Sequence, residues 1–256
     1  MFLRTINLPT DRGRPLPKHS KLIETVKKGL STVRKRGRKQ QSTETCYMCD
    51  RPRTSREHSP PIGFFPESRR VNVITVPSCK THNNDNSFDV EYTRNIIVTD
   101  NHSNDVAREM FAEKVLPSFK KGHKLRRFTF EKYRETKVDG LDSAIVHIHE
   151  SHFNPIIRAI ANALFFHDYG EKYKYRWMVY RATGEHLDGR VDDINPQIRA
   201  FLRSINVDGR ATNQPEVFNY GVYGHNGMAH RIIYKLVFYG GVDIYTIGLP
   251  NDSDVW

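Results

Sequence analysis

Three cysteines and one histidine have the types and the spacing of a metal site. Cys46 and Cys49 form a C-x2-C pair, and Cys79 and His82 form a C-x2-H pair further along the chain. Two such pairs can place four thiolate and imidazole ligands tetrahedrally around one Zn²⁺. All three cysteines of the chain belong to this pattern. The sequence therefore predicts one structural Zn²⁺, and the alternative of incidental thiols beside a surface histidine stays open.

A closed four-ligand zinc site has no vacant position for a reacting water, so any chemistry must come from other residues. The segment between the pairs contains Glu57-His58-Ser59-Pro60-Pro61, and Asn83 follows His82 directly. A neutral histidine can take a proton from water near pH 7. Carboxylate and amide oxygens suit a hard divalent cation. His58 beside a proline turn could also be an ordinary surface histidine.

These residues resemble the HNH endonucleases. The zinc-bearing members have a C-x2-C pair, then Glu-His-x-x-Pro, then Val-Pro-x-Cys-x2-(Cys/His)-Asn, and residues 46–92 have the same order. The resemblance implies a ββα-metal fold, in which a strand ends at the acidic residue and histidine. A second strand then leads to the zinc pair and a helix.

Carried over by position, the resemblance implies a role for each motif residue. His58 is the general base, while Glu57 and Asn83 hold the catalytic cation. Asp89 and Glu91 match an acidic cluster in the following helix, which would ligate the cation or hold His58; a solvated helix face is the alternative.

Two positions depart from the family pattern. Asn72 is the candidate for the middle motif asparagine, and Asn86 stands where members often have a lysine.

The motif residues together predict two kinds of metal cofactor. They are a structural Zn²⁺ and a separate catalytic Mg²⁺, Mn²⁺ or Ni²⁺.

The positive charge of the chain is concentrated in its first forty residues. The whole chain carries a net charge of +11, and residues 1–40 hold 12 basic and 2 acidic side chains, a net charge of +10. Such an arm can neutralise phosphates without reading sequence. The residues expected to do so are Arg34, Lys35, Arg36, Arg38 and Lys39. A solvated basic tail or a targeting signal would have the same composition.

Composition narrows the class of protein. The chain has 256 residues, of which 38% are hydrophobic and 27% charged, enough for a packed core. Its apolar runs are too short to cross a bilayer, and the first twenty residues lack an apolar signal core. Three cysteines do not make a disulfide scaffold. We therefore expect a cytoplasmic protein with no membrane association.

Hydrophobic periodicity and turn residues predict the elements that position these side chains. Helices are expected over 21–36, 105–119, 154–167 and 195–205, with Pro155 near the first turn of the third. Strands are expected within 126–150, including Phe128-Thr129-Phe130, and over 173–180, 217–223, 231–239 and 242–247. Gly240-Gly241 predicts a hairpin between the last two.

Together, these observations predict an α+β protein with three regions. They are a basic N-terminal arm with one amphipathic helix (1–40), a zinc-stapled ββα-metal module (41–100) and a C-terminal α/β region with an antiparallel meander (101–256). The expected function is metal-dependent hydrolysis of phosphodiester bonds, with DNA as the expected substrate. The resemblance makes a role in microbial, anti-phage defence plausible.

Two non-catalytic functions stay open. One is a zinc finger that binds nucleic acid, and the other is a subunit of a nuclease complex whose basic arm contacts another chain. The sequence leaves the oligomeric state open as well, including a homo-oligomer or a defence complex.

Overall fold

The computed structural model describes residues 44–84, 87–121, 123–138, 140–181, 196–224 and 232–251. The basic arm, its expected helix at 21–36 and the cluster Arg34, Lys35, Arg36, Arg38 and Lys39 lie outside the described residues. Within them, helices are mixed with antiparallel strands, which confirms the α+β prediction. No helix in the described part of the chain has the length and apolar character needed to cross a membrane.

The zinc-motif region folds as a hairpin followed by helices. Strand β1 (Ser55–His58) pairs antiparallel with β2 (Thr75–Ser78), so that Glu57 lies opposite Val76 and His58 lies opposite Thr75. Two 3-10 turns, η1 (Ile62–Phe64) and η2 (Glu67–Arg69), lie in the connection, and α1 (Lys80–Asn84) and α2 (Ser87–Val98) follow β2. The order of these elements is therefore two paired strands followed by two helices.

The helix expected over 105–119 is interrupted by a π-helical turn. It consists of α3 (Asp105–Met110), η3 (Phe111–Val115) and α4 (Leu116–Lys121). Pro117 has no N–H for the carbonyl of Glu113, and its ring crowds that carbonyl, so the preceding turn widens.

The expectation of a strand at Phe128-Thr129-Phe130 is wrong, because Phe128 lies in α5 (His123–Thr129). A three-residue alternation is too short to decide the structure, and long-range packing does so here. The Phe128 ring stacks on His149 at a centroid distance of 4.1 Å and meets Tyr92 edge-on at 5.3 Å. The strands expected within 126–150 form later, as the hairpin of β3 (Tyr133–Val138) and β4 (Leu141–Val146).

The longest helix, α6 (Glu150–Tyr169), begins four residues earlier than expected. Pro155 therefore lies inside the helix and removes the hydrogen bond to the carbonyl of Ser151. Both residues are exposed, so water can satisfy that carbonyl. Gly170 ends the helix in the left-handed conformation, with φ of 71°.

A five-stranded antiparallel sheet forms the rest of the described chain, in the order β5-β9-β8-β7-β6. Its strands are β5 (Arg176–Arg181), β6 (Asp208–Arg210), β7 (Phe218–Gly224), β8 (Ile232–Phe238) and β9 (Val242–Leu249), and α7 (Pro196–Ser204) precedes β6. The expected helix at 195–205, the three late strands and the hairpin at Gly240-Gly241 are confirmed. Strand β6 was not predicted, because three mostly exposed residues carry no alternation.

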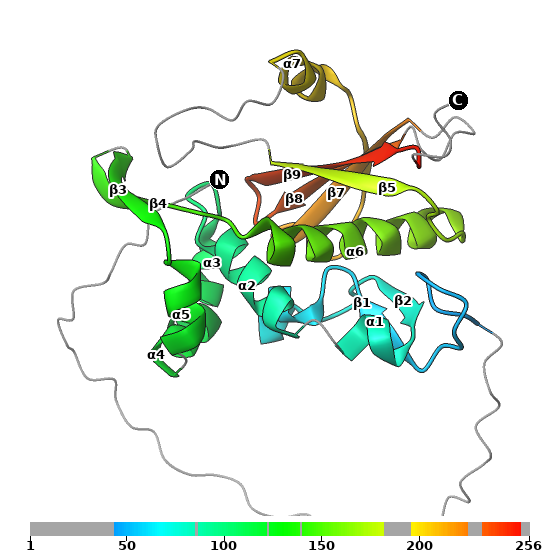
Figure 1. The fold of residues 1–256 in the computed structure, drawn as a ribbon, viewed down its shortest axis with the longest axis horizontal. Helices are drawn as coiled ribbons and strands as arrows, with labels where there is room; N and C mark the ends of the chain where they lie inside the picture. Colours follow the sequence, from blue (N-terminus) through cyan, green and yellow to red (C-terminus); the bar gives the residue numbers. More distant parts are fainter. Residues whose placement is uncertain are drawn as a thin grey trace, which may run out of the picture. The chain divides into compact units, whose positions relative to one another are not determined.

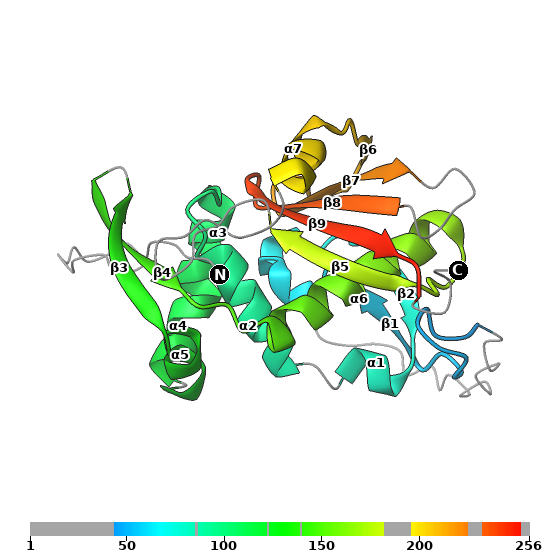
Figure 2. The ribbon, with the colours of Figure 1, turned by 45° about the horizontal axis from the view of Figure 1, so that its top comes forward.

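Helix α6 lies between this sheet and the zinc-motif region (Figures 1 and 2). It contacts β5 and β9 of the sheet, and it contacts β2 and α2 on its other side. The main hydrophobic core includes Phe64 and Tyr92 from the first part of the chain and Ile157 and Tyr234 from the second. Residues of the expected regions 41–100 and 101–256 thus share one core.

Candidate metal centre and adjoining cavity

The four expected zinc ligands lie together, and their ligand atoms are all within 4.8 Å of one another. The Nδ1 atom of His82 lies 3.2 Å from the sulfur of Cys46, 3.6 Å from that of Cys49 and 3.5 Å from that of Cys79. The sulfurs of Cys49 and Cys79 are 3.8 Å apart.

These separations fit a tetrahedral zinc ion. Bond lengths of about 2.3 Å to sulfur and about 2.05 Å to nitrogen imply sulfur–sulfur separations of about 3.8 Å and sulfur–nitrogen separations of about 3.6 Å. The cluster is therefore compatible with a zinc site of three thiolates and one imidazole.

Backbone hydrogen bonds shape the first half of this cluster. The N–H of Cys46 donates to the carbonyl of Arg51, and the N–H of Tyr47 donates to the carbonyl of Pro77 in β2. The N–H of Met48 approaches the Cys46 sulfur at 3.5 Å. These bonds fold residues 46–51 back on β2 and bring both cysteine pairs to one place.

The surroundings shift the pKa values of two of the thiols in opposite directions. Burial and the neighbouring sulfurs raise the pKa of Cys49, because a second negative sulfur is unfavourable beside the first. Burial also acts to raise the pKa of Cys79, but donors that include the N–H groups of His82 and Thr81 outweigh it and lower that pKa. A divalent cation would remove the repulsion between the thiolates.

Next to the cluster lies a cavity of about 470 Å³. Its polar wall comes from the end of β1 and from α1 and α2, and includes Glu57, His58, His82, Asn83, Glu91 and Arg94. Its apolar wall comes from α6, where Ile156 and Ile160 face it. The structure thus brings Glu57, His58 and Asn83 to one cavity, and places His82 between that cavity and the cluster.

His58 is poised to accept a proton. The imidazole is half-buried at the end of β1. Burial and the positive charge of Arg70 lower the pKa of His58 below its usual value of 6.5. Both effects disfavour the charged imidazolium, so the ring is neutral near pH 7, as a general base must be.

Glu57 is a partly buried carboxylate. Burial raises the pKa of Glu57, and the nearby Tyr47 and Ser78 hydroxyls partly oppose this effect. The Ser78 hydroxyl donates to Oε2 of Glu57 at 3.2 Å. A cation in the cavity would stabilise the ionised carboxylate, which is the chemistry of a metal ligand.

Asn83 extends the metal centre into the cavity. Its amide nitrogen donates to the Ser55 hydroxyl at 2.7 Å, which fixes the side chain against β1. The carbonyl oxygen, the atom that would bind a hard cation, is not used in this bond.

The structure separates the two acidic residues of α2. Glu91 lines the cavity, where its Oε1 accepts hydrogen bonds from Ser118 at 2.6 Å and from Arg94 at 3.3 Å. Asp89 is not on the cavity wall; its Oδ1 pairs with Nδ1 of His152 on α6 at 2.7 Å. Residues two positions apart on a helix point about 200° apart, so the carboxylates of Asp89 and Glu91 face different sides of α2.

Arg94 is a site residue that the sequence reasoning missed. Its side chain is only 11% exposed, and it pairs with Glu91 and with Oδ1 of Asn95. Burial lowers the pKa of Arg94, but the neighbouring Glu91 opposes this, and a guanidinium stays charged near neutral pH. The spacing of Glu91 and Arg94, three residues apart in an expected helix, was the available signal.

Asn72, the candidate for the middle motif asparagine, does not line this cavity. It lies in the connection between β1 and β2 and lines a different cavity.

Comparison with family models, with curated proteins and with solved structures gives no match for this chain.

The cluster predicts one equivalent of zinc in the purified protein. Cys79→Ser should lower the zinc content well below one equivalent and lower the melting temperature by at least about 10 °C, because the metal ties residues 46–51 to β2 and α1. Metal analysis and thermal unfolding measure both effects.

Met48→Ser is the matched control, because Met48 lies between two ligands but is 39% exposed. It should keep the full zinc content. Wild-type protein that contains no zinc when purified without chelators would contradict the assignment.

The environment of His58 predicts its titration in protein without added divalent cation. The His58 ring should titrate below pH 6.5, and Arg70→Gln should move its pKa upward, because the substitution removes a positive charge that opposes protonation. Histidine ring NMR signals, assigned with His58→Asn, report this value.

Arg69→Gln is the control, since Arg69 pairs with Glu216 at 3.0 Å and is not a cause of the His58 shift. A His58 pKa above 6.5, or one that Arg69→Gln moves as much as Arg70→Gln, would contradict this account.

Proposed function

We propose that this protein is a metal-dependent endonuclease of the HNH type, which hydrolyses phosphodiester bonds in DNA. One observation carries the proposal: a single cavity beside the Cys₃His cluster holds His58, Glu57 and Asn83. These are the residues that the resemblance assigns to the general base and to the catalytic cation.

The residues divide the work of hydrolysis among them. His58, neutral near pH 7, takes the proton of the attacking water. Glu57 and Asn83 would hold a divalent cation, with Glu91 as a further oxygen donor, and that cation would offset the charge that develops on the phosphate. The zinc cluster has four protein ligands, so its role is to hold β2 and α1 in place.

Arg94 adds a fixed positive charge to this arrangement. A guanidinium matches the oxygens of a phosphate, and its effect is larger in a partly buried site than in water. Glu91 and Asn95 hold the Arg94 side chain before any substrate binds. Arg94 is therefore suited to bind the phosphate that is cleaved.

The apolar wall from α6 supports the same function. Ile156 and Ile160 exclude water from one side of the cavity. A dry wall strengthens the attraction between the charged groups and the phosphate. The defence role that the resemblance makes plausible belongs to this proposal as its biological context.

The central test is cleavage of supercoiled DNA with added Mg²⁺, Mn²⁺ or Ni²⁺. His58→Ala should lower the rate by at least about 100-fold, because it removes the general base, and it should keep the zinc content, the melting temperature and the affinity for DNA. Gel analysis of nicked and linear products measures the rate.

His102→Ala is the control, since His102 lies in the loop after α2, outside the cavity, and should cleave at the wild-type rate. Equal rates for His58→Ala and wild type would refute the role of His58. A protein that binds DNA but cleaves it with none of the three cations would be the non-catalytic zinc finger instead.

The two acidic residues of α2 make a second test. Glu91→Gln should raise the Mg²⁺ concentration for half-maximal cleavage by at least about 10-fold, because Glu91 faces the cavity. Asp89→Asn should change it by less than about twofold, because Asp89 pairs with His152 outside the cavity.

Titration of cleavage with Mg²⁺ measures both variants. If Glu91→Gln needs the same Mg²⁺ concentration as the wild type, Glu91 is not a ligand of the cation. A larger effect for Asp89→Asn than for Glu91→Gln would indicate that the cation binds near Asp89 and His152 instead.

A further inference from the structure

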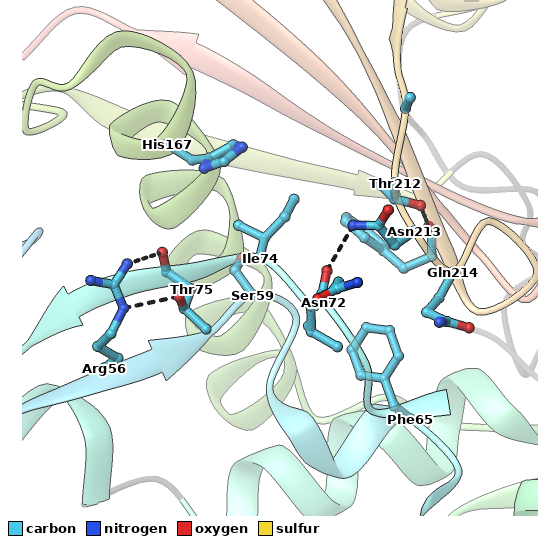
Figure 3. A pocket seen from close by; sticks show the side chains of 13 residues that line it. Arg56, Ser59, Phe65, Asn72, Ile74, Thr75, His167, Thr212, Asn213 and Gln214 are labelled. Carbon is cyan, nitrogen blue, oxygen red and sulfur yellow. Dashed lines mark hydrogen bonds between the residues drawn. The ribbon is translucent and has the colours of Figure 1, made fainter. Parts of the chain in front are cut away.

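A second cavity lies beside the β1–β2 hairpin, away from the zinc cluster. It has a volume of about 390 Å³ and is formed by the hairpin and its connection, the end of α6 and the segment before β7 (Figure 3). Arg56 and Thr75 line it. They lie on the face of the hairpin opposite Glu57 and Val76, because successive strand side chains alternate.

The polar groups of this cavity are basic or neutral. None of its thirteen described lining residues is acidic. Arg56 and His167 stand on one side, and the carboxamides of Asn72, Asn213 and Gln214 stand on the other (Figure 3). A site without carboxylates does not suit a hard cation, and it does suit an anionic ligand with hydrogen-bonding edges.

The adjoining cavity has a different balance of charge. It has a volume of about 860 Å³ and shares Arg56, Thr75 and His167 with the cavity of about 390 Å³. Its three acidic residues are matched by three Lys and Arg residues: Glu44, Asp50 and Glu171 against Arg56, Lys172 and Lys174. The excess of positive charge is therefore confined to the smaller cavity.

Hydrogen bonds hold the polar groups in position. Nε and Nη2 of Arg56 donate to the hydroxyl and the carbonyl of Thr75 at 3.0 and 3.1 Å, and among the described residues Nη1 makes no hydrogen bond. Asn213 Nδ2 donates to the carbonyl of Asn72 at 2.9 Å, and Gln214 Nε2 approaches the carbonyl of Val71 at 3.5 Å. Neither bond uses the two amide oxygens.

Nη1 of Arg56 and the amide oxygens of Asn213 and Gln214, which these bonds do not use, match the parts of a nucleotide. Asparagine and glutamine side chains pair with the edges of bases, and arginine binds phosphate. Phe65 and Phe218, each only 2% exposed, supply an apolar surface beside the amides. The cavity volume lies within the range of about 300–1,000 Å³ that is typical of small-ligand sites.

The position of the cavity links it to the catalytic centre. Ser59, the residue after His58, lines both cavities. We expect a nucleic-acid strand with one phosphate at His58 to place a neighbouring nucleotide near Arg56 and the amides.

We infer that the cavity lined by Arg56, Asn72, His167, Asn213 and Gln214 binds one nucleotide of the substrate strand, with Arg56 at its phosphate and the carboxamides at the edge of its base. This inference rests on the proposed function and adds a base-reading contact beside the cleaved phosphate. Phosphate contacts position a strand, whereas contacts with base edges give sequence preference.

The test measures binding rather than cleavage, and uses full-length protein with His58→Ala so that the strand stays intact. Labelled oligonucleotides of varied sequence are titrated by fluorescence anisotropy. Adding Asn213→Ala and Gln214→Ala together should weaken binding by at least about 10-fold for the preferred sequence and reduce the difference between sequences. Asn101→Ala is the control, because Asn101 also has a carboxamide side chain but lines neither cavity. It should leave the affinity and the difference between sequences unchanged.

Arg56→Gln provides a second, independent variant. It should make the slope of log affinity against log salt concentration shallower by about one, because it removes one phosphate contact. It should leave the sequence preference unchanged. Circular dichroism and zinc content establish that each variant is folded.

Unchanged affinity and sequence preference in both pocket variants would overturn the inference. A panel of mononucleotides distinguishes a free nucleotide from a strand. If mononucleotides bind and Asn213→Ala with Gln214→Ala abolishes that binding while oligonucleotide affinity is unchanged, the cavity is a site for free nucleotides and the inference is wrong. Because binding is measured, failure of the wild-type protein to cleave would count against the proposed function alone.

Discussion

The burial of helix α6 on two sides is the constraint on which the rest of the structure depends. Its buried residues are Phe153, Ile156, Ile157, Ile160, Ala161, Ala163, Leu164 and Phe165, and the helix contacts β5 and β9 of the sheet as well as β2 and α2 of the zinc-motif region. Burial of apolar surface is the main force that drives folding. The sheet therefore packs on one side of α6 and the zinc-motif region on the other. At the end of the helix, Asp168 accepts hydrogen bonds from the hydroxyls of Tyr220 and Tyr234 at 2.7 and 3.2 Å, which fixes the helix on the sheet.

The same helix connects the two cavities. Ile156 and Ile160 form a wall of the cavity that holds His58, and His167 belongs to the cavity that holds Arg56. The hairpin supplies the opposite wall in both cases. If both proposals hold, hydrolysis and base recognition share one helix as a support, and functional side chains are best positioned when they lie on such elements.

What could be predicted from the sequence was mostly local. The spacing of the ligands predicted the cluster, because two residues separated by two others, as in each C-x2-C or C-x2-H pair, can bind the same ion. The late strands were predicted because alternation and a Gly-Gly turn act over a few residues. The α6 wall was not predictable, since nothing near His58 in the sequence indicates that Ile156 lies across the cavity. The choice between Asp89 and Glu91 also depended on distant partners, His152 for one and Ser118 for the other.

The adjacency of His82 and Asn83 limits how this chain can change in length. Neighbouring residues on a helix point about 100° apart, so Nδ1 of His82 faces the thiolates while the Asn83 side chain, at the cavity wall, reaches the Ser55 hydroxyl. Inserting or deleting a residue between Cys79 and Asn83 would rotate every later side chain of α1 and would exchange or lose these two functions at once. The connection between β1 and β2 has no such restriction over Glu67–Arg69, which is largely exposed. Homologous chains should therefore differ in length between the hairpin strands, while the interval from Cys79 to Asn83 stays constant.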